Sequence, residues 1–280
     1  MPSHLDKAPR TLRVVYRSCP LGASSTKTRP RWFTKDLALT SYLTAVDMAT
    51  DRGIPVHTTW LNDGALSSGV LDLMGDTGRI VHAEHGTNRG SYRHAVALAA
   101  SDPDVEDTDL IWFAEDDYLY HPDALLHLLD GAHRFPAVDY FSLYSPQDLV
   151  HPDRAQVRPG WVHGTATTST FGVRAAALRR DRRLLRVLPF VGAAWDWASM
   201  HVVTGRRPYP DGRLPWEVDG LGVTRTVALQ LAGHAANVLS RLRPARLFMA
   251  SDPVMAWHME GDAPARWETI AKATAARIWV

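Results

Sequence analysis

Short apolar runs alternate with helix-like stretches over the first 130 residues of the chain. Four of these runs have the length and composition of strands: Leu12 to Tyr16, Ile54 to Leu61, Arg79 to Ala83 and Leu110 to Ala114. Three stretches between them have helical spacing: Phe33 to Thr50, Ser67 to Gly75, and Tyr92 to Ala100 with Ser91 as the expected N-cap. Strict alternation of strand and helix predicts a parallel sheet with right-handed crossovers and helices on both faces, a three-layer α/β/α (Rossmann-like) fold.

The pattern is less regular after residue 130. The elements that we expect there are a strand at Tyr140 to Tyr144, strand and loop at Trp161 to Gly172, a basic helix at Val173 to Leu188, a helix from Ala194 through Val203, a strand at Trp216 to Leu221, a loop or helix at Ala232 to Met249, and a closing helix at Pro264 to Arg277. We expect one mostly parallel α/β domain with two functional halves, 1–130 and 131–280.

An apolar run that ends in three adjacent acids is the most distinctive stretch of the chain. Leu110 to Ala114 is short, apolar throughout and bounded by charge, so it predicts a strand buried on both faces. Glu115, Asp116 and Asp117 follow at once. The next residues, His121-Pro122-Asp123, predict a helix start with proline at the first helical position. The triple acid is therefore expected at the carboxyl edge of the sheet, where open α/β sheets bind ligands.

Three adjacent carboxylates repel one another unless a positive charge lies among them. Because alternate residues of an extended segment point the same way, Glu115 and Asp117 are expected to face one point and Asp116 to turn away. Oxygen ligands of this kind suit a hard divalent cation, Mg²⁺ or Mn²⁺. A solvated acidic loop at a helix start is the alternative interpretation.

Composition narrows the class of protein. The chain has 280 residues, 45% of them hydrophobic, and a net charge of +1, so bulk charge gives no reason to expect a nucleic-acid partner. Cys19 is the sole cysteine, which excludes an intramolecular disulfide and a Cys-based zinc site. Met1 to Arg13 lacks the apolar region of a signal peptide, and no transmembrane segment is expected. Abundant Arg and Ala suggest a GC-rich bacterial genome, and we expect a cytoplasmic protein.

Other candidate ligand groups lie at predicted strand ends and helix starts. Asp63, in Asn62-Asp63-Gly64, is placed either to accept hydrogen bonds from a ribose or base, or to form a turn. The Gly-rich segment His85 to Ser91 precedes a helix, where anions bind readily. Asp196 lies between Trp195 and Trp197 and is either a partly desolvated base or a helix cap.

These residues together resemble the nucleotide-sugar-dependent glycosyltransferases of the GT-A fold. Glu115-Asp116-Asp117 is similar to that superfamily's Asp-x-Asp motif, and Asn88 to Ala95 resembles the Asn-x-Gly, Arg, Ala pattern that precedes the motif in family-2-type members. Asp196 and His258 lie in the order in which these enzymes carry a catalytic acid and a late histidine. The chain departs from the pattern in having Glu-x-Asp, which leaves open whether Glu115 binds the metal directly.

The resemblance implies transfer of a sugar from a nucleotide diphosphate donor to an acceptor hydroxyl, on a glycan or a small molecule, with Mn²⁺ or Mg²⁺ as cofactor. It implies these roles: metal binding for Asp117, Glu115 and His258; diphosphate binding for Arg17 and Arg93; base or ribose binding for Asp63 and Asp116; and proton abstraction by Asp196 in an inverting reaction.

Two other functions stay open. A sugar-phosphate nucleotidyltransferase uses a similar sheet, but Leu21-Gly22-Ala23-Ser24 is only faintly like its Gly-rich signature. A lectin-like module would bind sugar on its tryptophans without a metal. A dinucleotide-dependent dehydrogenase is disfavoured, because no Gly-x-Gly-x-x-Gly follows the first strand.

Overall fold

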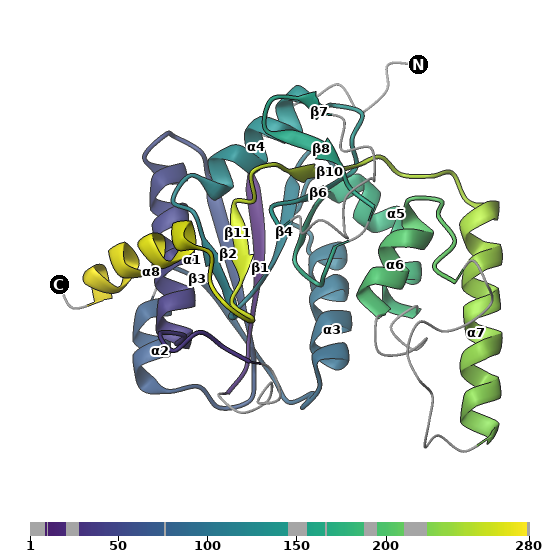
Figure 1. Ribbon diagram of the computed structural model, residues 1–280, viewed down its shortest axis with the longest axis horizontal. Helices are drawn as coiled ribbons and strands as arrows, with labels where there is room; N and C mark the ends of the chain where they lie inside the picture. The colour runs from purple at the N-terminus through teal and green to yellow at the C-terminus, as the bar shows by residue number, and fades with distance from the viewer. Residues whose placement is uncertain are drawn as a thin grey trace.

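In the part of the chain that the structure describes, nine strands form a sheet with helices on both faces (Figure 1). The computed structural model describes residues 9, 11–20, 28–75, 77–144, 156–165, 167–187, 195–209 and 223–278. The strands are β1 Leu12–Ser18, β2 Val56–Asp63, β3 Gly78–Ala83, β4 Leu110–Glu115, β5 Tyr118–Tyr120, β6 Tyr140–Ser142, β7 Gln156–Arg158, β8 Trp161–His163, β9 Phe171–Arg174, β10 Phe248–Ser251 and β11 Ala256–His258. The helices are α1 Lys35–Thr50, α2 Ser68–Met74, α3 Asn88–Ser101, α4 Ala124–Arg134, α5 Ala175–Val187, α6 Trp195–Val203, α7 Val223–Leu242 and α8 Ala265–Ile278.

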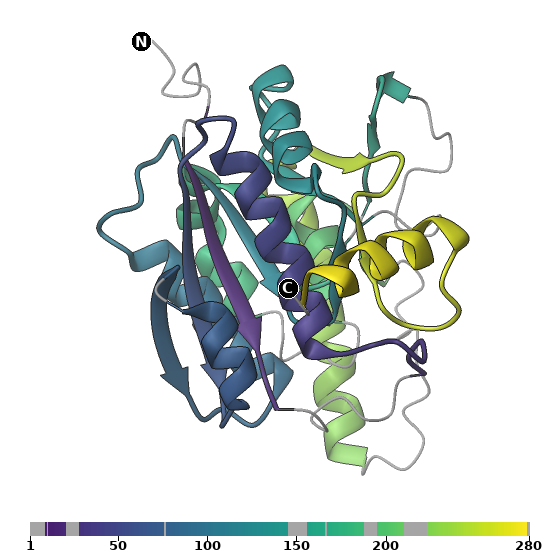
Figure 2. The ribbon, with the colours of Figure 1, turned by 90° about the vertical axis from the view of Figure 1, so that its left-hand side faces the viewer.

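The first four strands pair in parallel in the order β3-β2-β1-β4. Their carboxyl ends therefore meet at one edge, towards which the arrowheads point in Figure 2. Beyond β4 the order continues β9-β6-β10-β8-β7, and β8 and β9 run against the other strands. The predicted three-layer α/β/α architecture with a mostly parallel sheet is confirmed.

Alternate residues of the strands feed two separate cores, one on each face of the sheet. In β4, Ile111 and Phe113 pack with α3 and α5, whereas Leu110, Trp112 and Ala114 pack with α1 and α4. All five of these side chains are fully buried. The run buried on both faces that the sequence predicted is thus confirmed, and it holds β4 rigidly in the middle of the sheet.

Two predicted helix starts are corrected. Thr87, not Ser91, caps α3: its side chain accepts a hydrogen bond from Gly90 N (3.1 Å), and Ser91 lies in the first turn. The helix expected at Pro122 begins two residues later, at Ala124, as α4. Asp123 occupies its N-cap position and makes no side-chain capping bond.

The second half differs more from the sequence-based expectation. The start of the predicted helix at Val173 is instead the end of β9, which is inserted antiparallel between β4 and β6. Ala232 to Met249, for which the sequence allowed a loop or a helix, contains the second half of α7 and the start of β10. The strand expected at Trp216 to Leu221 lies outside the described residues. In the part of the chain that is described, no helix is both long and apolar enough to cross a bilayer.

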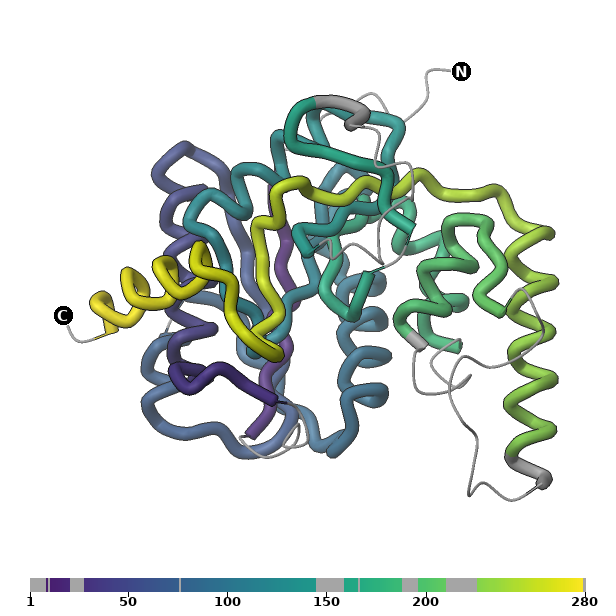
Figure 3. The backbone as a smooth tube through the Cα atoms, viewed as in Figure 1, coloured from purple at the N-terminus to yellow at the C-terminus, as the bar shows by residue number. Residues whose placement is uncertain are grey.

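A second, two-stranded sheet brings the chain's end to the carboxyl edge. β11 pairs antiparallel with β5, which follows the acidic triplet, and His258 is opposite Tyr118 in the register. Figure 3 follows this return of the chain from the end of α7 across the sheet to β10 and β11. The pairing joins residues more than 130 positions apart, and it fixes the place of His258 beside the end of β4.

Candidate active site

A cavity of about 540 Å³ opens at the carboxyl edge of the parallel strands. Groups from β1, β2, β4, α3, α6 and β11 line it. The charged and polar ones among them include Arg17, Asp63, Glu84, Asn88, Glu115, Asp116, Asp117, Asp196 and His258. Seven of the eight residues that we predicted as site residues thus lie around one cavity. Carboxylates outnumber cations in this lining.

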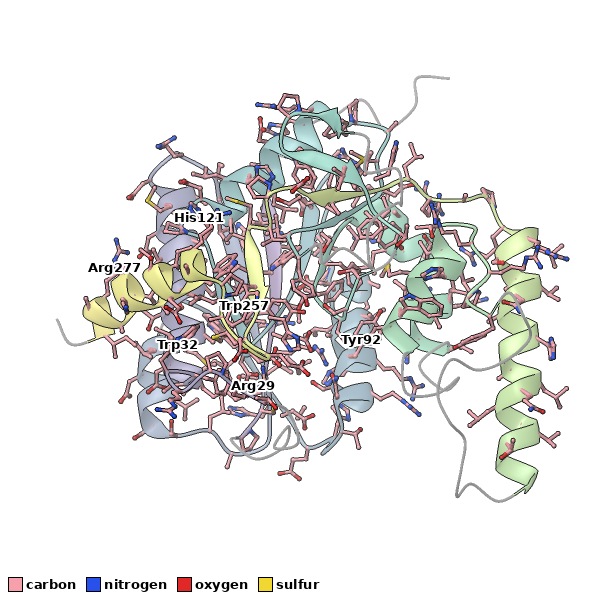
Figure 4. All side chains as sticks on the ribbon, viewed as in Figure 1. Arg29, Trp32, Tyr92, His121, Trp257 and Arg277 are labelled. Carbon is pink, nitrogen blue, oxygen red and sulfur yellow. The ribbon has the colours of Figure 1, made fainter. Side chains whose placement is uncertain are left out.

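Asp117 lies just past β4 and is held by two basic side chains. Arg29 donates to its Oδ2 over 2.8 Å, and His258 Nε2 is 3.0 Å from the same oxygen. Met259 N donates to the backbone carbonyl of Asp117 (2.9 Å), so β11 is tied to this residue by main chain and side chain together. Figure 4 shows Arg29 near the edge of the sheet at which β11 ends.

The other oxygen of Asp117 has no such partner. Oδ1 is buried, and no described residue hydrogen-bonds it. Burial alone would raise the pKa of Asp117, but the hydrogen bonds and charges of His258 and Arg29 outweigh burial and hold that pKa well below its usual range. A buried, ionised carboxylate oxygen without a donor is costly unless a cation or a proton donor reaches it.

The donor set at this point fits a divalent cation only in part. Asp117 Oδ1 supplies one hard oxygen. Both ring nitrogens of His258 are engaged, Nε2 with Asp117 Oδ2 (3.0 Å) and Nδ1 with Glu260 Oε2 (3.2 Å), so a metal contact would require His258 to give up one of them. Within the described ranges, no three His, Cys, Asp or Glu side chains are grouped as a complete metal site. A cation held here would take its remaining ligands from water or from a phosphate-bearing ligand, as Mg²⁺ commonly does.

Glu115 is engaged by other groups. Arg17 NH2 donates to its Oε1, and Thr170 Oγ1 donates to its Oε2 over 2.9 Å. Burial raises the pKa of Glu115, and the charge of Arg17 partly offsets that effect. Each oxygen of Glu115 thus already accepts one hydrogen bond.

Arg17 is a buried cation facing the cavity. Besides Glu115, its guanidinium contacts Asn88, donating from NH1 to Oδ1 over 2.9 Å, and lies 5.7 Å from the centre of the Tyr92 ring. Its Nε is buried and makes no hydrogen bond with a described residue. Since Asn88 is the first residue of α3, Arg17 and the positive end of that helix dipole lie together.

Asp116 points to the side of the sheet opposite to Glu115, towards α1. It forms an ion pair with Lys35 (Nζ to Oδ1, 2.5 Å) and accepts a hydrogen bond from Cys19 N over 2.8 Å. Burial raises its pKa, and Lys35 counteracts that rise. Asp116 still lines the cavity, together with the end of β1 that it fixes.

Asp63 holds the loop before α3. Its Oδ1 accepts hydrogen bonds from the backbone of His85 (2.6 Å) and Gly86 (3.3 Å). The carboxylate thereby ties the end of β2 to the Gly-rich segment, and both line the cavity.

Asp196 lines the cavity from the first turn of α6, and its Oδ1 accepts a hydrogen bond from Trp197 N over 2.9 Å. Trp197 packs on His201 and Tyr209, with ring centres 4.0 and 6.2 Å away. This tryptophan is therefore engaged with protein side chains. Arg93 lies on α3 but is not among the residues that line the cavity.

Three contacts of the site involve residues that the sequence did not single out for these roles. Lys35 neutralises Asp116, Arg29 binds Asp117, and Thr170 donates to Glu115. Arg29 lies in a polar loop with several other charges and Thr170 in a Thr-rich stretch, so the sequence does not distinguish either from its neighbours. Lys35 likewise carries no pattern that sets it apart.

Comparison with protein-family models and with curated proteins gives no match. Solved structures with a related fold include S. aureus TarS, with 11% identity, a TM-score of 0.43 and coverage of 69% of this chain and 33% of TarS. The galactosyltransferase LgtC, in complex with donor and acceptor sugar analogues, has 11% identity, a TM-score of 0.43 and coverage of 93% and 95%. The structure of 4-diphosphocytidyl-2C-methyl-D-erythritol synthase has 14% identity, a TM-score of 0.41 and coverage of 81% of this chain and 99% of its own.

The chain thus spans about a third of the length of TarS. At 11 to 14% identity and TM-scores of 0.41 to 0.43, the likeness to these proteins is one of fold alone.

Proposed function

We propose that the protein is a metal-dependent glycosyltransferase that moves a sugar from a nucleotide diphosphate donor to an acceptor hydroxyl. The observation that carries the proposal is the environment of Asp117. This carboxylate is buried at a strand end beside His258, and one of its oxygens lacks a donor among the described residues. The cavity around it has an excess of acids, so an anionic diphosphate needs a cation in order to bind there.

The donor side of the cavity would be built on β1, β2 and α3. Arg17 faces the cavity with its orientation set by Glu115 and Asn88, and a guanidinium so fixed suits a phosphate oxygen. The N-terminus of α3 adds backbone N–H groups and a positive dipole end. Asp63, at the end of β2, supports the loop against which a nucleoside would lie.

Asp117 would hold Mn²⁺ or Mg²⁺ through Oδ1, joined by His258 when one of its ring nitrogens leaves Asp117 or Glu260, with Glu115 positioning Arg17. The bound ion would supply Lewis-acid stabilisation of the charge that develops on the departing diphosphate. Arg17 and the α3 N-terminus would bind the same charge directly, because both are fixed before the reaction begins.

Asp196 would act as the general base towards the acceptor. Its carboxylate takes the hydroxyl proton as the acceptor oxygen bonds to the anomeric carbon, and the electron pair of the broken carbon–oxygen bond leaves with the diphosphate. Attack from the face opposite the leaving group inverts the anomeric configuration. The location of Asp196 on the α6 side of the same cavity supports this role.

The test is a panel of nucleotide diphosphate sugars incubated with the protein and Mn²⁺. We expect at least one of them to release its nucleoside diphosphate, and we expect that release to cease when the metal is chelated. Release of pyrophosphate from a nucleoside triphosphate and a sugar phosphate would instead identify a nucleotidyltransferase. Sugar binding without metal and without turnover would identify a binding module.

A matched pair of variants separates the site from a general loss of structure. Asp117→Asn is expected to abolish release of the nucleoside diphosphate. Asp123→Asn is expected to leave it unchanged, because Asp123 is exposed at the start of α4 and does not line the cavity. Normal turnover by Asp117→Asn would remove the metal assignment.

A further inference from the structure

The exposed apolar side chains of this protein gather on one helix. Five of the eight large hydrophobic residues that are exposed in the described part of the chain belong to α7: Val227, Leu231, Val238, Leu239 and Leu242. Leu231 and Leu242 are 64% and 75% exposed. Figure 1 shows α7 along the edge of the molecule opposite α8, with its length open on the outer side.

These residues form one face of the helix. Val227, Leu231, Val238 and Leu242 recur at intervals of four, seven and four, so they lie within a sector of about 60° at 3.6 residues per turn. Leu239 widens the apolar face on one side. A helix of 20 residues is about 30 Å long, so the apolar face is an extended stripe and not an isolated spot.

The opposite face of α7 is already occupied. Ala236 and Ser240 are buried, and α6 packs on this side. Asn237 exchanges two hydrogen bonds with the backbone of Tyr209, at 3.0 and 2.6 Å. These contacts fix the orientation of α7, so its apolar stripe faces outward.

The charged residues of α7 itself have one sign. The α7 sequence contains no Asp or Glu, and the polar edge of its exposed face carries Gln230, His234 and Arg241. Between residues 174 and 246 the chain has 13 Arg and five acids, a formal charge of +8, whereas the remaining residues carry −7. The near-neutral total therefore conceals a basic segment to which α7 belongs.

We propose that the apolar face of α7 docks on a bilayer that contains anionic lipids. The helix would lie in the plane of the headgroups, with the stripe at the acyl boundary and Arg241 among the phosphates. An apolar face with a basic polar edge and no acid is the pattern of interfacial helices. Asp107 and Asp139, outside this segment, pair with three of its Arg residues, and the excess of positive charge that remains supplies the attraction to a negative surface.

Charge decides against a second copy of the chain as the occupant. A symmetric pairing through α7 would bring two basic segments together, and no acid of α7 is present to offset them. A bilayer with anionic headgroups offers the complementary charge and a continuous apolar layer. The proposal does not depend on the proposed glycosyltransferase activity.

The experiment is co-sedimentation of the full chain with lipid vesicles. We expect binding to phosphatidylcholine vesicles that contain about 30% phosphatidylglycerol, at least about tenfold stronger than binding to phosphatidylcholine alone. Raising the salt to about 0.5 M should weaken the binding, because screening removes the electrostatic part of the attraction.

The double variant Leu231→Gln/Val238→Gln tests the stripe itself. Both side chains are exposed, so the fold should be retained, which a thermal melt checks. We expect its partitioning onto the anionic vesicles to fall about tenfold. Ile80→Gln is the matched control: Ile80 is likewise exposed but lies on β3, and this variant should bind as the unaltered chain does.

Three results would overturn the proposal. The first is no sedimentation of the unaltered chain with anionic vesicles at low salt. The second is equal binding by the double variant. The third is a dimer in solution that the double variant abolishes while vesicle binding is unchanged, which would make the face a contact between two copies.

Discussion

The two oxygens of Asp117 are in different environments, and that asymmetry is the basis of the proposed chemistry. Oδ2 is satisfied by Arg29 and His258, so the carboxylate is ionised and fixed in direction. Oδ1 is buried without a donor among the described residues. A residue held so firmly by one oxygen presents the other at a defined point, which is what a metal ligand requires.

Arg17 is held in its orientation by a planar guanidinium group that donates to Asn88 and Glu115 at the same time, which a lysine ammonium group lacks. We therefore expect Arg17→Lys to weaken the binding of nucleoside diphosphate about tenfold, as measured by titration calorimetry. Arg13→Lys is the matched control, because Arg13 lies on the same strand but pairs with Asp109 outside the cavity. Equal affinity of the Arg17→Lys variant and the unaltered protein would show that Arg17 does not contact the diphosphate.

Asp196 is predicted to act on the acceptor and not on the donor. Asp196→Asn should lower kcat by about 10² to 10⁴, since that is the usual contribution of a general base. The affinity for nucleoside diphosphate, measured separately, should stay near that of the unaltered protein. Two outcomes contradict this role: full turnover by the variant, or a product that keeps the anomeric configuration of the donor.

At the scale of elements, local patterning located the strands of the first half well and those of the second half poorly. β4 was predictable because Leu110 to Ala114 is apolar on both faces and ends at charge. The insertion of β9 and the pairing of β5 with β11 were not, because each joins segments far apart in the sequence. Short strands of three or four residues also carry too little periodicity to be seen.

The candidate site was predictable to the same extent. A parallel sheet brings its strand ends to one edge, so Asp63 and the acidic triplet were expected together. Alternation predicted that Asp116 would turn away from its two neighbours, but the basic partner of each acid was not predictable, because the partners come from segments far apart in the sequence. Asp116 turned towards Lys35, and Glu115 towards Arg17.

Asp181 on α5 is the main polar connection between α5 and the segment after α7. Only 1% of its side chain is exposed, and it binds Arg243, Arg246 and the hydroxyl of Tyr140. Asp181→Ala would leave the Arg243 guanidinium and the buried Tyr140 hydroxyl without this acceptor, and Arg246 would keep its longer contact with Asp139 (3.8 Å). We expect a loss of about 3 kcal/mol or more in the free energy of unfolding, measured by denaturant titration.

Asp107→Ala is the control for this change. Asp107 pairs with Arg179, which lies on α5 like Asp181. Because 61% of the Asp107 side chain is exposed, its loss should cost less than about 1 kcal/mol in the free energy of unfolding. If the two variants unfolded at the same denaturant concentration, the network around Asp181 would not tie α5 to the chain after α7.

At the scale of the whole molecule, partly buried His201 should make the protein less stable in mild acid. Burial lowers the pKa of His201 to about 4. Between about pH 6.5 and 4 the unfolded chain, with its higher histidine pKa, therefore binds more protons than the folded one. The free energy of unfolding decreases as the pH is lowered across that window. For His201 the loss amounts to at most about 3 kcal/mol by pH 4.

His201→Gln removes this titration and should flatten the fall in melting temperature between pH 6.5 and 4. His163→Gln is the matched control for the substitution, because His163 is exposed on β8. The burial of His201 would play no part in acid sensitivity if its replacement left the slope unaltered.

The measurement that tests the central claim most directly is calorimetric titration of nucleoside diphosphates into the protein with and without Mn²⁺. We predict that at least one of UDP, GDP, CDP, ADP and TDP binds at least about tenfold more tightly with the metal, and that Asp117→Asn loses this difference while melting as a folded protein. Absence of metal-assisted binding for all five, or its persistence in Asp117→Asn, would contradict the account.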